Sequence, residues 1–99
     1  MLSRAQIQKI LSEYFSGKPV LRAYLFGSYA RGEADENSDI DVLVELDYEL
    51  NRSIWGAYVA MKDELGIKLG KKVDLVSSDG LSKYVAPYIH RDKVLVYER

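Results

Sequence analysis

The hydrophobic pattern near the start of the chain repeats every three to four residues and predicts an amphipathic helix over residues 3–15. Ser3 and Gln6 have the spacing of a capping box, which satisfies backbone N–H groups at the start of a helix. Gly17 and Pro19 follow, and we expect them to end the helix. The apolar stripe of this helix consists of Ile7, Ile10, Leu11, Tyr14 and Phe15.

Short apolar or alternating runs predict strands over residues 20–26, 39–46, 72–76 and 94–97. Because side chains alternate between the two faces of a strand, Leu21, Ala23 and Leu25 share one face of the first strand. In the second strand, one face carries Ile40, Val42, Val44 and Leu46, and the other carries Asp39, Asp41, Leu43 and Glu45.

Two more helices are predicted between these strands. One begins after a cap at Asn51 or Ser53 and is expected to end at Gly66, with an apolar stripe of Ile54, Trp55, Tyr58, Met61 and Leu65. The other is short, spans about 84–90 and has Pro87 near its start. Residues 29–38 are polar and indicate a loop. This alternation of helices and strands predicts an α/β or α+β domain.

Composition restricts the chemistry that this fold can support. The chain has 99 residues, which predicts a single domain over residues 1–99. It has no cysteine and one histidine, which excludes disulfides, thiolate metal sites and histidine-rich zinc sites. Its apolar stretches are too short for a membrane span, and the first residues lack the apolar core of a signal peptide, so we expect a cytoplasmic location.

The charge balance restricts the partners. Fourteen basic residues against fifteen acidic ones leave a net charge of −1, which argues against strong, direct nucleic-acid binding. Any nucleotide bound here is therefore expected to need a metal ion as a charge mediator.

Asp39 and Asp41 stand in an otherwise apolar strand and are the sharpest chemical feature of the sequence. Residues two apart on a strand point to the same face with Cα atoms about 6.6 Å apart, so two carboxylates can converge on one hard cation. Oxygen-only ligation suits Mg²⁺ or Mn²⁺ together with substrate phosphates. The alternative is that the aspartates sit at an exposed strand end and cap a loop.

Three further positions extend this feature. Gly27 and Ser28 end the preceding strand, where backbone N–H groups and a hydroxyl can approach a phosphate; a loop with a helix cap is the simpler alternative. Arg31 can add a charged fork, or can pair with Glu33 or Glu36 at the surface. Asp74 can complete a three-carboxylate site or remain a solvated strand residue.

Together these residues resemble the signature of nucleotidyltransferases of the DNA polymerase beta superfamily. The string GSYARGEADENSDIDVLV is similar to the minimal nucleotidyltransferase (MNT) branch, in which GSxARG is followed by a polar stretch and SDIDL. Val42 stands where leucine is usual. The matching residues are Gly27, Ser28, Ala30, Arg31, Gly32, Ser38, Asp39, Ile40 and Asp41, with Asp74 as the third carboxylate.

The resemblance implies a nucleotidyltransferase fold, with a mixed central sheet of about four strands flanked by helices, and a role for each residue. Asp39 and Asp41 are expected to hold two Mg²⁺ ions, and Asp74 to ligate the catalytic metal and accept a proton from the acceptor. Gly27 and Ser28 are expected to contact the β- and γ-phosphates of ATP, with Arg31 as a further phosphate contact.

The resemblance also implies a partner. The MNT branch resembles the antitoxin half of toxin–antitoxin modules whose other half is a HEPN-domain toxin, and it implies transfer of AMP from ATP to a tyrosine hydroxyl of that toxin. The short chain is expected to need self-association or a partner to complete its active site. Two alternatives remain, namely an antitoxin that neutralises its HEPN partner by binding alone and an enzyme with a small-molecule acceptor.

Overall fold

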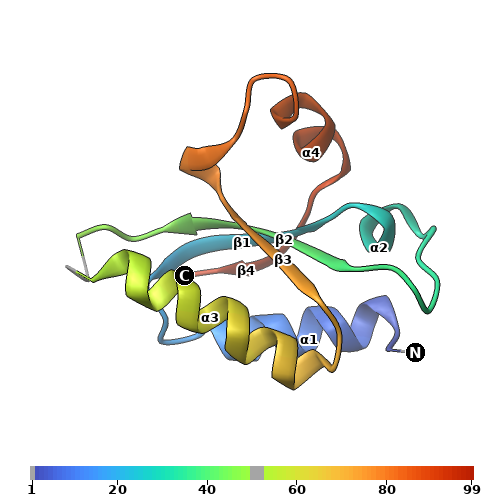
Figure 1. Ribbon diagram of the computed structural model, residues 1–99, viewed down its shortest axis with the longest axis horizontal. Helices are drawn as coiled ribbons and strands as arrows, with labels where there is room; N and C mark the ends of the chain where they lie inside the picture. The colour runs from blue at the N-terminus through green and yellow to red at the C-terminus, as the bar shows by residue number, and fades with distance from the viewer. Residues whose placement is uncertain (1, 50–52) are drawn as a thin grey trace.

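The computed structural model describes residues 2–49 and 53–99, which form a four-stranded mixed sheet with strand order β3-β2-β1-β4 (Figure 1). Strand β1 pairs antiparallel with both β2 and β4, whereas β2 and β3 run parallel. The elements are α1 (Arg4–Phe15), β1 (Val20–Phe26), α2 (Ser28–Arg31), β2 (Ile40–Leu46), α3 (Ile54–Leu69), β3 (Val73–Ser77), a 3-10 turn (Ser78–Gly80), α4 (Ala86–Asp92) and β4 (Val94–Glu98). The predicted mixed α/β fold is confirmed.

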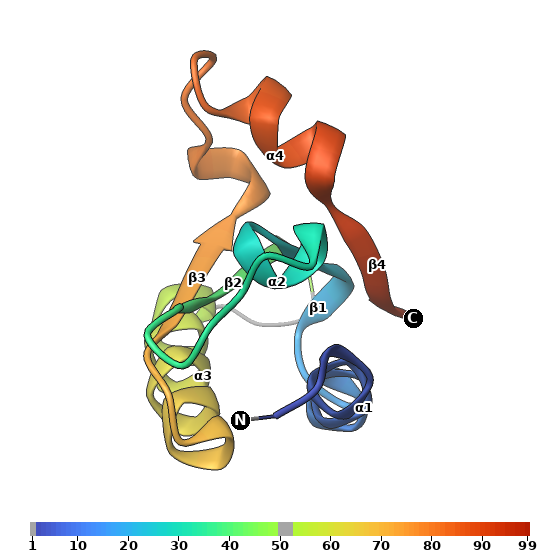
Figure 2. The same ribbon diagram turned by 90° about the vertical axis from the view of Figure 1, so that its right-hand side faces the viewer.

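The helices lie on both sides of the sheet. Helices α1 and α3 pack side by side against one face, while α4 lies on the other side and α2 follows the end of β1 (Figure 2). The Tyr14 hydroxyl donates a 2.6 Å hydrogen bond to Glu64 Oε2, which joins α1 to α3. Among the described residues, no helix combines the length and the apolar character that crossing a membrane requires.

The core lies between the sheet and these two helices. The predicted inward face of β2 is confirmed, because Ile40, Val42 and Val44 are fully buried. The capping box at the start of α1 is also present, since Ser3 Oγ accepts from Gln6 N–H and Gln6 Oε1 accepts from Ser3 N–H. Burial of apolar surface of this kind contributes about 25 cal/mol per Å² and supplies most of the stability of a small domain.

The predicted inward face of β1 is wrong at Leu21. Val20 is fully buried and Leu21 is 38% exposed, whereas Ala23 and Leu25 are buried as expected. The pairing of β1 with β2 shifts register between Val20 and Arg22. A residue inserted in this way reverses the alternation on one side of the irregularity, so the apolar pattern alone misplaces Leu21.

The predicted end of α3 at Gly66 is also wrong. The helix continues to Leu69 and ends at Gly70, whose φ of +63° is the left-handed conformation that favours glycine. The extra turn buries Leu69, which extends the apolar contact made by Leu65. At the other end, Ser53 is the N-cap residue, and the alternative cap Asn51 lies outside the described residues.

The remaining boundaries differ by small shifts. Strand β3 spans Val73–Ser77 where 72–76 was predicted, and β4 ends at Glu98. Helix α4 spans Ala86–Asp92 where about 84–90 was predicted, with Pro87 in its first turn. The polar segment after β1 begins with the single-turn helix α2 before it becomes a loop.

The contact of α3 with the core predicts a stability difference between two residues of the same helix. Leu65 is fully buried, so we expect Leu65→Ala to lower the free energy of unfolding by about 2–5 kcal/mol. Ile67 is 83% exposed, and Ile67→Ala is expected to change it by no more than about 0.5 kcal/mol. Urea denaturation followed by circular dichroism measures both, and equal losses would contradict this packing.

Candidate active site

The strand pairing brings the predicted carboxylates together. The parallel register places Asp41 of β2 directly opposite Asp74 of β3, so both side chains project from the same face of the sheet. Asp39 lies two residues before Asp41, immediately before β2 begins. Asp41 is partly buried, whereas Asp39 and Asp74 are exposed. The structure therefore assembles the three aspartates that sequence reasoning selected, on the face opposite α1 and α3.

The surroundings of Asp41 disfavour the ionised form of its carboxyl group. Burial and then the nearby carboxylates of Asp74 and Asp39 raise the pKa of Asp41 to about 6, while Arg31 and Lys72 act in the opposite direction. Lys72 Nζ lies 3.8 Å from Asp39 Oδ2 and pairs with it at the surface. Positive charge at this cluster is therefore stabilising, whether it comes from a proton, a lysine or a cation.

Gly27 approaches the cluster through its backbone. Its φ is +74°, and a Cβ atom at this position would lie 2.1 Å from Asp41 Oδ2, well inside van der Waals contact. Glycine is thus required twice here, for the backbone conformation and for the close approach to the carboxylate. The predicted proximity of the Gly27–Ser28 turn to the aspartates is therefore present in the fold.

A pocket of about 360 Å³ opens beside this turn, within the range of small-molecule sites. It lies between the turn, Asp41 and helix α4, whereas Asp39 and Asp74 lie outside its lining. Its lining residues are Phe26, Gly27, Ser28, Arg31, Asp41, Val85, Tyr88, Ile89 and Asp92.

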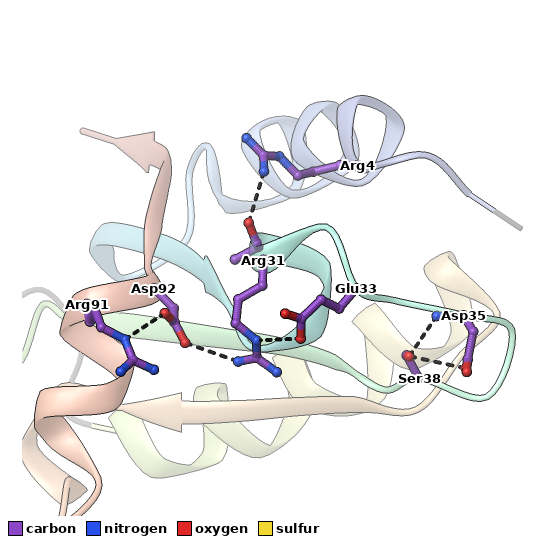
Figure 3. Close-up of polar contacts among 8 residues, drawn as sticks. Arg4, Arg31, Glu33, Asp35, Ser38, Arg91 and Asp92 are labelled. Carbon is purple, nitrogen blue, oxygen red and sulfur yellow. Dashed lines mark hydrogen bonds and ion pairs between the residues drawn. The ribbon is translucent and has the colours of Figure 1, made fainter.

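Arg31 connects the turn to α4 through ion pairs (Figure 3). Its Nε donates to Glu33 Oε2 and its Nη1 donates to Asp92 Oδ2, both at 3.0 Å. The suggested pairing with Glu33 is confirmed, and the additional pair with Asp92 holds the guanidinium in the pocket lining. Hydrogen bonds from Arg91 and then Arg31 lower the pKa of Asp92, so this carboxylate stays ionised.

Sequence reasoning missed the contribution of α4. Val85, Tyr88, Ile89 and Asp92 line the pocket, yet no motif links them to the Gly27–Ser28 turn about 60 residues earlier. The only signal in the sequence is their spacing of three, four and seven residues, which places them on one face of a helix. Tyr29 does not belong to the site, because it is buried (4% exposed) and packs beneath the turn.

The donor set fits a hard divalent cation, because three carboxylates supply the oxygen ligands that Mg²⁺ prefers. Asp41 and Asp74 are cross-strand neighbours, and Asp39 is near enough to raise the pKa of Asp41. Within residues 2–49 and 53–99, however, no three acidic or histidine side chains lie close enough together to hold a metal ion. The exposed carboxylate of Asp39 pairs with Lys72, so it must change partner to take part in binding a cation.

Comparison with known proteins identifies the family. Residues 4–96 match the family model described as a nucleotidyltransferase domain. The chain belongs to the nucleotidyltransferase domain family. The matched range includes the Gly27–Ser28 turn and all three aspartates.

Individual relatives agree with this assignment. A candidate protein adenylyltransferase of Methanocaldococcus jannaschii is 40% identical over 90 residues, which cover 90% of this chain and 86% of the relative. The protein adenylyltransferase MntA of Thermococcus cleftensis is 36% identical over 103 aligned residues, which cover 97% of this chain and 98% of that protein. A crystal structure of a toxin–antitoxin complex with AMP-PNP contains a chain of the same fold, 25% identical with a TM-score of 0.74, over 94% of this chain and 73% of that one.

The close approach of Gly27 to Asp41 predicts a loss of activity in Gly27→Ala. The new Cβ must displace the Asp41 carboxylate, and a displacement of about 1 Å at a reacting centre can cost about 100-fold in rate. Transfer of a labelled nucleotide from its triphosphate measures the effect.

Gly17→Ala is the matched control for this prediction. Gly17 also has a positive φ, of +85°, but no atom lies within 4 Å of its added Cβ. Both variants place a Cβ atom on a residue with a positive φ, and a loss of activity confined to Gly27→Ala supports the contact with Asp41. Similar activities in the two variants would contradict it.

The raised pKa of Asp41 predicts that this carboxylate destabilises the metal-free fold at neutral pH. Because the folded pKa of about 6 exceeds the unfolded value of 3.8, stability is lost as the pH rises from about 4 to above 6. We expect Asp41→Asn to raise the stability at pH 7.5 by on the order of 1 kcal/mol after allowance for solvent screening, or roughly 4–8 °C in Tm.

Thermal unfolding in the presence of a chelator at pH 7.5 and pH 4 measures this difference. At pH 4 the carboxyl is protonated, so Asp41→Asn and the wild type are expected to unfold at similar temperatures. Asp63→Asn, on the exposed surface of α3, is the control and should change Tm little at either pH. A destabilised Asp41→Asn protein at pH 7.5 would show that the carboxylate cluster is not repulsive.

Proposed function

We propose that this nucleotidyltransferase transfers AMP from ATP to a hydroxyl group of a partner protein and thereby acts as the antitoxin of a HEPN-domain toxin, with a tyrosine as the acceptor. The observation that carries the proposal is the position of the carboxylate cluster. It adjoins the Gly27–Ser28 pocket at Asp41 and the edge strand β3 at Asp74, whose side chain is exposed. This arrangement suits a small donor that binds in a pocket and a large acceptor that approaches from solvent.

The donor side is assigned to the turn and its neighbours. The backbone of Gly27 and the hydroxyl of Ser28 are suited to the β- and γ-phosphates, because both line the pocket beside Asp41. The Arg31 guanidinium adds positive charge to the same pocket and orients through its pairs with Glu33 and Asp92. The relative named MntA and the complex solved with AMP-PNP support ATP as the donor.

Asp39, Asp41 and Asp74 are the residues that would hold Mg²⁺, with two ions expected. Bound Mg²⁺ supplies positive charge that stabilises the attacking and leaving oxygens during transfer of a phosphoryl-type group. The carboxylates themselves are held in place by the parallel pairing of β2 with β3, whose buried residues fix the register. The positioning of the ligands is thus a property of the sheet.

The acceptor side is assigned to Asp74. This residue is exposed and lies on β3, which is an edge strand of the sheet. A carboxylate in this position can accept the proton of an incoming hydroxyl while the rest of a large partner remains outside. The toxin–antitoxin complex with a chain of the same fold supports a protein acceptor.

The proposal predicts that Asp39→Asn combined with Asp41→Asn abolishes transfer of AMP and leaves the fold intact. The two changes remove carboxylates and fill the same volume, so the sheet packing is preserved. Radiolabelled ATP and Mg²⁺ are incubated with this protein and the product of the neighbouring gene, which the proposal expects to be a HEPN-domain protein, and label on that partner is measured after electrophoresis.

The wild type should label the partner, and replacing the acceptor tyrosine of the partner with phenylalanine should remove the label. Asp63→Asn is the matched control and should label normally, since Asp63 lies on the exposed surface of α3. Full labelling by the double variant would overturn the assignment of the carboxylates. A double variant that fails to label yet still neutralises the toxin would show that binding alone is sufficient.

A further inference from the structure

The lining of the pocket beside the Gly27–Ser28 turn comes from two segments of different chemistry. The turn, α2 and β2 contribute the backbone of Gly27 and the polar or charged side chains of Ser28, Arg31 and Asp41. Helix α4 and its N-cap contribute Val85, Tyr88 and Ile89, which are apolar or aromatic, together with Asp92, which pairs with Arg31. A nucleoside triphosphate has a similar division, because its triphosphate is charged and its base presents flat aromatic faces.

Helix α4 presents its pocket residues from one face. Tyr88, Ile89 and Asp92 lie three, four and seven residues after the N-cap residue Val85, and all four line the pocket. Ile89 is 5% exposed and anchors the helix, while Asp92 ties it to Arg31 through the 3.0 Å ion pair. The position of α4 relative to the turn is thus held from both sides, which Figure 3 shows for the Arg31–Asp92 pair.

Tyr88 is the large exposed side chain of this face. It is 62% exposed although it lines the pocket, and the Arg91 guanidinium carbon lies 5.4 Å from the centre of its ring. A flat aromatic ligand that stacks on an exposed ring of this kind gains binding free energy. Any of the nucleic-acid bases can stack in this way, because each has an aromatic face.

We propose that Tyr88, supported by Val85, is the residue on which the base of the bound nucleoside triphosphate packs while the phosphates occupy the Gly27–Ser28 end. This inference rests on the proposed function, because it assumes that the pocket takes a nucleoside triphosphate. It assigns to α4 a role in binding the nucleoside half of the donor. The helix would therefore contribute to nucleotide affinity without touching the reacting phosphate.

The chain offers a matched control on the same segment. Tyr84 is also an exposed tyrosine, at 74%, and lies four residues before Tyr88. It is absent from the pocket lining, and its ring lies 5.2 Å from Lys83 Nζ. Removing either ring deletes a similar exposed side chain, but only Tyr88 is placed to contact a ligand in the pocket.

The experiment compares two ligands that share only the phosphate end. Isothermal titration calorimetry measures the Kd of ATP and of inorganic tripolyphosphate, each with Mg²⁺, for the wild type, Tyr88→Ala, Tyr88→Phe and Tyr84→Ala. We expect Tyr88→Ala to weaken ATP about tenfold and tripolyphosphate less than about twofold. Tyr88→Phe keeps the ring and should bind ATP like the wild type, as should Tyr84→Ala.

The other outcomes distinguish a failure of the role assigned to Tyr88 from a failure of the proposed function. A wild type that binds ATP, together with Tyr88→Ala that binds it equally well, would overturn the role of Tyr88 and leave the proposed function standing. Equal weakening of ATP and tripolyphosphate in Tyr88→Ala would show that the ring supports the helix and would also overturn the inference. If the wild type binds neither ligand, the proposed function fails and the inference fails with it.

Discussion

The mutual repulsion of three carboxylates on one face of a small sheet is the constraint around which this protein is organised. The backbone pairs Asp41 with Asp74 across two strands and places Asp39 beside them, so burial and then these two carboxylates raise the pKa of Asp41. The fold maintains this arrangement because the opposite face of the same strands is packed against α1 and α3. Hydrophobic burial on one face thus holds an unfavourable electrostatic arrangement on the other, and a cation relieves it.

The elements around the cluster form a pocket beside it. Gly27 approaches Asp41 so closely that no side chain fits, and the turn that it begins continues into α2. Arg31 at the end of α2 pairs with Asp92 of α4, so the Gly27–Ser28 turn and helix α4 are joined beside the pocket. On the other side of the cluster, Asp74 is exposed on β3, which is an edge strand of the sheet.

Local sequence signals predicted most of the helices and strands. They also selected the aspartates and the Gly27–Ser28 turn, but not the contribution of α4 to the pocket. The capping box of α1 and the alternation in β2 depend on neighbouring residues, and both are confirmed. The aspartates are recognisable because carboxylates in an apolar strand are costly unless they serve a purpose. Their convergence with Asp74 could be expected from the strand pattern and the family resemblance, and the parallel register supplies the geometry that the pattern lacks.

The sequence by itself determined helices α1, α3 and α4, the four strands, the mixed fold class and the three carboxylates as candidates, because each of these is encoded by the periodicity or identity of adjacent residues. Only the tertiary structure decided the outward position of Leu21, the extension of α3 to Leu69 and the contribution of α4 to the pocket. The first depends on a shift in strand pairing, the second on burial against the core, and the third on an ion pair between residues 61 positions apart. Interactions between distant segments leave no local pattern, so the α4 side of the pocket becomes visible only in the folded chain.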